Sequence, residues 1–99
     1  MTFRLNNLNY NLPKLAREIG YKPLRYTSEG ELNCVRPLGG AYPRFHIYVK
    51  EEKGVLIFSL HLDQKKPSYE GTRAHGGDYD SDTVKDEAER IKEIIFRRY

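Results

Sequence analysis

The sequence predicts one small α+β domain, a four-stranded antiparallel sheet with one face covered by an N-terminal and a C-terminal helix. Three observations predict this fold class. A chain of 99 residues supports one hydrophobic core and not two. Segments near both ends repeat apolar residues with the period of a helix, and the residues between them alternate with the period of a strand. The predicted order is therefore helix, four strands, helix, within a single domain of residues 1–99.

The first predicted element is a helix over residues 12–19, preceded by an irregular, Asn-rich segment over residues 1–10. Asn11 is a favourable N-cap, and Pro13 lies in the first turn, where its missing N–H has no cost. Gly20 follows the helix at the position where a left-handed residue commonly ends one. Four apolar residues share one helix face, namely Leu12, Leu15, Ala16 and Ile19.

Four β segments follow, and Gly-containing turns separate the first from the second and the third from the fourth. Alternation is clearest in the last two, where every second residue is apolar. One face of this hairpin is therefore predicted to be buried under the helices, and the other to be polar. The predicted strands are residues 23–27, 31–36, 44–50 and 55–63. The buried face is predicted to hold Phe45, Ile47, Val49, Leu56, Phe58, Leu60 and Leu62.

A long connection, residues 64–81, leads to the last helix and has no periodic apolar pattern. Loops of this length in compact domains are usually functional or mobile. The final helix is predicted from Thr83 to about Arg97, with Ser81 or Asp82 as its cap. Its apolar stripe is Val84, Ala88, Ile91, Ile94 and Ile95, and i,i+4 ion pairs are predicted at Asp86–Arg90 and Glu93–Arg97.

Several functional classes lack their sequence signals. No apolar run approaches the roughly 18 residues of a membrane span, and the N-terminal residues have no signal-peptide core. The single cysteine, Cys34, is expected to be reduced and half-buried in a strand. We therefore predict a cytoplasmic protein without membrane association. Neither Gly39-Gly40 nor Gly76-Gly77 belongs to a phosphate-binding or dinucleotide-binding motif, so no cofactor is predicted.

No motif names a reaction, and a binding module is favoured over an enzyme. Residues 1–50 carry eight Lys or Arg and three Asp or Glu, a balance of +5, which favours an anionic partner such as nucleic acid. The binding surface would be the polar sheet face together with the long loop. Its candidate residues are Arg36, Arg44, His46, Tyr48, His61, Asp63, Lys65, Lys66, Tyr69, Arg73 and His75.

Two alternatives use the same surface differently. His46, His61, Asp63 and His75 could form a metal site, because imidazole and carboxylate groups are common ligands and the i,i+2 spacing of His61 and Asp63 places both on one strand face. This alternative predicts a metal-binding protein or a metal-dependent hydrolase. In the other, the outward apolar residues Val55 and Ile57, or an exposed sheet edge, mediate a structural role such as a homodimer.

The order helix, strands, helix is similar to that of double-stranded-RNA-binding domains. In that family the second helix opens with lysines that contact phosphates. Here the equivalent turn, Thr83-Val84-Lys85-Asp86-Glu87, carries net negative charge. The resemblance therefore implies a related arrangement of elements and does not imply the RNA contact.

Overall fold

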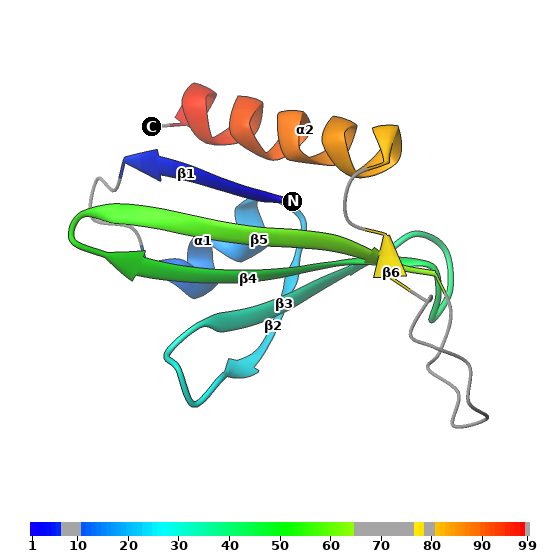
Figure 1. The fold of residues 1–99 in the computed structure, drawn as a ribbon, viewed down its shortest axis with the longest axis horizontal. Coiled ribbons are helices and arrows are strands. Elements are labelled where there is room, and N and C mark those ends of the chain that lie inside the picture. The colour runs from blue at the N-terminus through cyan, green and yellow to red at the C-terminus, as the bar shows by residue number, and fades with distance from the viewer. Residues whose placement is uncertain (7–10, 65–76, 79–80, 99) are drawn as a thin grey trace.

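The computed structural model describes residues 1–6, 11–64, 77–78 and 81–98. Its strands form a curved antiparallel sheet, and both helices lie on the same side of it (Figure 1). The α+β class and the two-helix arrangement predicted from the sequence are therefore confirmed. The elements in chain order are β1 (Thr2–Asn6), α1 (Leu12–Glu18), β2 (Lys22–Tyr26), β3 (Leu32–Pro37), β4 (Arg44–Glu52), β5 (Val55–Asp63), β6 (Gly77–Asp78) and α2 (Asp82–Arg98).

The sheet has five main strands in the order β1-β5-β4-β3-β2, and the short β6 also pairs with β5. The predicted number of four was therefore wrong, because residues 2–6 form a strand where an irregular segment was expected. β1 runs antiparallel to β5, with Phe3 opposite Phe58 and Leu5 opposite Leu56. The Phe3 and Phe58 rings stack with their centroids 4.8 Å apart. The apolar alternation of Phe3 and Leu5 is thus a strand pattern that the surrounding asparagines obscured.

The β4–β5 hairpin forms the centre of the sheet and has the predicted alternation. Its two-residue loop is Lys53-Gly54, and both residues have positive φ, 53° and 79°. This is the backbone geometry of the tight turns that match the twist of a hairpin. Ile47 opposite Leu60 and Val49 opposite Phe58 lie on the face covered by the helices. β6 pairs with Leu62 and Asp63 at the far end of the same hairpin.

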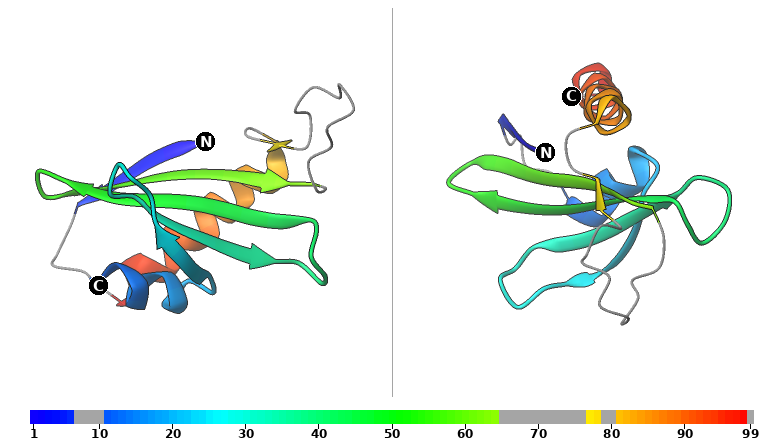
Figure 2. Two further views of the ribbon diagram at one scale, coloured as in Figure 1. Left: turned by 90° about the horizontal axis from the view of Figure 1, so that it is seen from below. Right: turned by 45° about the vertical axis from the view of Figure 1, so that its right-hand side comes forward.

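The helices begin where their capping residues predicted. The Asn11 side chain accepts a hydrogen bond from the Lys14 amide at 3.0 Å, and Ser81 Oγ accepts one from the Val84 amide at 3.3 Å. Gly20 follows α1 with φ of 91°. Each helix buries its predicted stripe against the sheet, so neither of the two described helices covers the opposite sheet face (Figure 2).

An ionic network, which we call the Glu87 network, joins the two helices and β3. Glu87 is on α2 and only 4% exposed. Its carboxylate accepts hydrogen bonds from Tyr21 Oη at 2.6 Å, Arg36 Nη1 at 3.2 Å and Arg90 Nε at 2.7 Å. Arg90 also donates to the carbonyl of Ile19 at the end of α1, at 2.6 Å. The carboxylate is therefore well compensated, and the network locks α2 against α1.

The i,i+4 spacing predicted an ion pair between Arg90 and Asp86. In the structure Arg90 pairs with Glu87 instead. A buried acceptor that already faces Tyr21 and Arg36 attracts the guanidinium more strongly than an exposed carboxylate does. The second predicted pair, Arg97 with Glu93, is present with 2.5 Å between Nη2 and Oε1.

We predict that β1 is part of the cooperative fold. Phe3→Ala should lower the free energy of unfolding by about 3 kcal/mol, because it removes a buried, stacked ring. Thr2→Ala, on the exposed face of the same strand, should change it by less than about 0.5 kcal/mol. Chemical denaturation measures both values. Equal small effects for the two variants would show that β1 does not contribute.

We predict that the Glu87 network is important for stability. Glu87→Ala should cost about 2–3 kcal/mol, because three side chains lose charge-assisted hydrogen bonds in a partly buried setting. Glu93→Ala removes an exposed ion pair of the same helix and should cost less than about 1 kcal/mol. Thermal melts of the two variants provide the comparison, and similar costs would contradict a special role for Glu87.

Candidate metal centre

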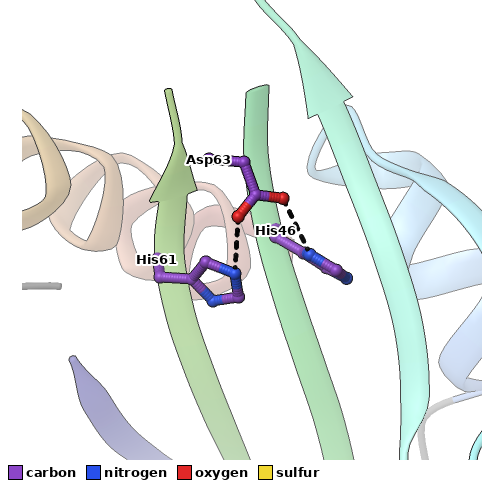
Figure 3. Close-up of side chains that lie close together, drawn as sticks. All are labelled: His46, His61 and Asp63. Carbon is purple, nitrogen blue, oxygen red and sulfur yellow. Dashed lines mark hydrogen bonds and ion pairs between the residues drawn. The ribbon is translucent and has the colours of Figure 1, made fainter. Parts of the chain in front are cut away.

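Three of the predicted site residues converge on the open face of the sheet. His46 comes from β4, and His61 and Asp63 come from β5 (Figure 3). His46 Nδ1 lies 3.2 Å from Asp63 Oδ2, and His61 Nε2 lies 2.9 Å from Asp63 Oδ1. One possible ligand atom from each residue lies within 4.8 Å of those of the other two. We call these three residues the His-His-Asp cluster.

The register of the hairpin produces this convergence. His46 is directly opposite His61, and Arg44 is directly opposite Asp63. Residues opposite each other and residues two apart on one strand share a sheet face. The imidazole rings of His46 and His61 therefore stand side by side, with centroids 4.8 Å apart, and Asp63 lies beyond them at the end of β5.

Asn33 on the neighbouring strand β3 completes the surroundings of His46. Its Oδ1 contacts His46 Nε2. Asn33 is 6% exposed and His46 is 9% exposed, so this contact is buried although α1 and α2 both lie on the other side of the sheet. Sequence reasoning did not identify Asn33. The only signal was its position one residue before Cys34, which places it on the outward face if Cys34 points inward.

The proton count of His46 is the most informative feature of the site. Its two ring nitrogens face two acceptors, Asn33 Oδ1 and Asp63 Oδ2. A neutral imidazole has one N–H and can satisfy one acceptor only. When Nε2 donates to Asn33, Nδ1 turns a lone pair towards the carboxylate, and a cation between them resolves the conflict. Turning the Asn33 amide is the other solution, since its NH₂ would then donate to Nε2 and leave Nδ1–H for Asp63.

Burial favours the neutral form of both histidines. Desolvation lowers the pKa of His46, and the nearby His61 lowers it further, against the opposing effect of Asp63. Desolvation also lowers the pKa of His61, again opposed by Asp63. A His46 ring protonated on both nitrogens would satisfy both acceptors, but burial disfavours this charged form. Neutral imidazoles are also the form that binds metals.

Two aromatic rings and one guanidinium surround the cluster. Tyr48 stacks on His46 with ring centroids 4.9 Å apart. Arg44 Nε donates to Asp63 Oδ2 at 3.3 Å, and the Arg44 guanidinium lies over the Tyr42 ring, 4.8 Å from its centroid. Tyr42 was not among the predicted residues, because it precedes Pro43 in a segment without strand periodicity.

Of the remaining predicted residues, the structure describes Arg36 alone, and it is not at this cluster. Arg36 lies on the helix side of the sheet, in the Glu87 network, with its guanidinium 5.8 Å from the Phe45 ring centroid. The proposed contribution of Arg36 to an outer binding face therefore has no support in its position. Lys65, Lys66, Tyr69, Arg73 and His75 lie outside the described residues.

Cys34 is fully buried and not half-buried as predicted. It lies on the helix side of β3, opposite Ile47. Burial raises the pKa of its thiol to about 12, so the reactive thiolate is suppressed. This environment does not activate Cys34 as a nucleophile.

Comparison with known proteins identifies no relative. No protein-family model matches the chain, and neither the curated proteins nor the solved structures include a significant match. Neither helix in the described ranges is long and apolar enough to cross a membrane. Any functional conclusion therefore depends on the cluster itself.

Proposed function

We propose that this domain binds a divalent transition metal, zinc in the first instance, through His46, His61 and Asp63. The convergence of two imidazoles and one carboxylate within 4.8 Å carries the proposal. Imidazole nitrogens suit zinc and its neighbours in the first transition row, whereas magnesium and calcium prefer all-oxygen sites. Tetrahedral zinc, with bonds of about 2.1 Å, places its ligand atoms about 3.4 Å apart. The 2.9 and 3.2 Å contacts are close to this spacing but involve different oxygens of Asp63, and the three ligand atoms lie within 4.8 Å of one another, so the side chains must move closer together to hold one ion.

The contact between His46 and Asn33 supports the same proposal. Metal-bound histidines usually donate their second N–H to a carbonyl or carboxylate oxygen, which fixes the tautomer and the ring orientation. Asn33 Oδ1 stands at His46 Nε2 and would hold Nδ1 unprotonated, facing His61 and Asp63. The Nδ1 lone pair of His46 would then point towards the carboxylate, which His61 Nε2 also faces at 2.9 Å. This arrangement resolves the proton count of His46 without a charged imidazole.

The three ligands found among the described residues leave one position of a tetrahedral site for a further ligand, and His75, the fourth residue predicted for the site, lies outside those residues. Structural zinc sites are normally closed by four protein ligands, and sites that bind water or substrate keep a free position. The side chains of His61 and Asp63 retain 13% and 21% of their exposure, so solvent reaches the cluster. The proposed function is therefore that of a metal site that solvent and a small ligand can reach.

The proposal predicts one zinc ion per chain and stabilisation by zinc. At a free zinc concentration 100 times the dissociation constant, stability should rise by about 2.7 kcal/mol. For a domain of this size the melting temperature should increase by roughly 10–20 °C. His61→Gln and Asp63→Asn should each weaken binding at least tenfold, and Asn33→Ala should weaken it about 10–100-fold. Competition with a chromophoric chelator, together with thermal shift, measures these effects.

Ser59→Ala provides the matched control, because Ser59 occupies the next outward position on β5 and is not in the cluster. It should leave zinc affinity unchanged. Circular dichroism of each variant without metal separates lost binding from lost fold. A wild-type protein that neither binds nor is stabilised by millimolar zinc would overturn the proposal.

The tautomer of His46 gives a second, independent test. Long-range ¹⁵N–¹H correlation spectra of the metal-free protein should show the proton on Nε2 and a bare Nδ1. A proton on Nδ1 would mean that the Asn33 amide is turned. The contact with Asp63 would then be an ordinary hydrogen bond, which counts against the metal site.

A further inference from the structure

We infer that the metal-loaded cluster binds a phosphate-type dianion, which bridges the metal and the guanidinium of Arg44. This inference rests on the proposed function and adds a ligand class and a second anchor to it. Arg44 is not a metal ligand. It is the cationic side chain closest to the cluster among those with a described contact, with its Nε 3.3 Å from Asp63 Oδ2.

The charge balance of the site changes when a metal binds. Without metal, the Asp63 carboxylate is shared by Arg44, His46 and His61, and with neutral imidazoles the charges of Asp63 and Arg44 cancel. A divalent ion coordinated by Asp63 leaves these four side chains and the ion with two positive charges in excess. Unbalanced charge in a partly buried site is costly, because it is screened less than at the surface. A dianion compensates it.

Asp63 Oδ2 is the atom that couples the metal to Arg44. It faces both His46 Nδ1 and Arg44 Nε, at 3.2 and 3.3 Å. Coordination of Asp63 by a metal withdraws electron density from this oxygen and weakens its bond with Arg44. The guanidinium then has N–H donors available for a ligand on the metal. Its planar, multiply donating shape suits two oxygens of a phosphate.

The position of Arg44 is favourable for this role. The guanidinium lies over the Tyr42 ring, which limits its orientations, and 28% of its side chain is exposed. Arg44 is at the start of β4, opposite Asp63, at the rim of the open sheet face. An anion can therefore approach the free metal position and the guanidinium from the same side.

Titration with phenyl phosphate tests the inference. The wild-type protein, loaded with Co²⁺ as a spectroscopic substitute for Zn²⁺, should change its visible absorption on adding the phosphate ester, and calorimetry should give the affinity. The metal-free protein should bind the ester at least tenfold more weakly. Acetate, a monoanion, should also bind more weakly than the ester, because it balances only one of the two charges.

Arg44→Gln separates the anchor from the metal. This variant should keep or increase metal affinity, because a repelling charge is removed, but lose roughly 10–100-fold in affinity for phenyl phosphate, as expected for a lost charge-assisted hydrogen bond. Lys50→Gln is the matched control, since it removes one positive charge from the same face of the same strand. Lys50 is six residues from Arg44, about 20 Å along the strand, beyond the range of unscreened attraction at physiological salt. It should change the affinity less than twofold.

The outcomes distinguish the two proposals. Metal binding without anion binding, equal anion affinity with and without metal, or equal affinity in wild type and Arg44→Gln would each overturn this inference and leave the metal site standing. Absence of metal binding would overturn the proposed function and this inference together. Affinity that depends on both the metal and Arg44 would support both.

Discussion

The two-residue turn at Lys53-Gly54 is the constraint on which the organisation of this domain depends. Its positive φ values pair Glu52 with Val55 and thereby set the register of the whole β4–β5 hairpin. Because side chains alternate between faces, a shift of one residue would move the apolar residues to the open face and the histidines into the core. The same turn therefore determines where the core lies and which polar residues meet on the opposite face.

The two faces of the sheet handle buried polarity in different ways. On the helix side, the Glu87 carboxylate is surrounded by donors from Tyr21, Arg36 and Arg90, and these contacts bring three elements together. On the open side, His46 faces two acceptors and has one proton for them when neutral. The first arrangement has its charges compensated and acts in folding. In the second, either a cation between His46 and Asp63 or a turned Asn33 amide satisfies the proton count of His46, and the metal and anion proposals concern the first of these solutions.

Much of the fold was predictable from local patterns. Asn11, Gly20 and Ser81 marked helix ends, and the alternation in residues 44–63 identified both faces of the central hairpin. Residues His46, His61 and Asp63 were predicted for the outward face for the same reason. Two other features escaped local reasoning. β1 is stabilised by pairing with β5, about fifty residues away, and the contact between Arg36 and Glu87 joins β3 to α2.

The sequence by itself determined the period of each element and therefore which side chains share a face, because caps, turns and alternation act over a few residues. Only the tertiary structure decided which faces and edges meet. The pairing of β1 with β5, the approach of Asn33 on β3 to His46, and the position of Arg90 against the end of α1 all join distant segments. Such contacts depend on the packing of whole elements, so no local pattern encodes them, and the proton count of His46 became visible only when three strands were placed side by side.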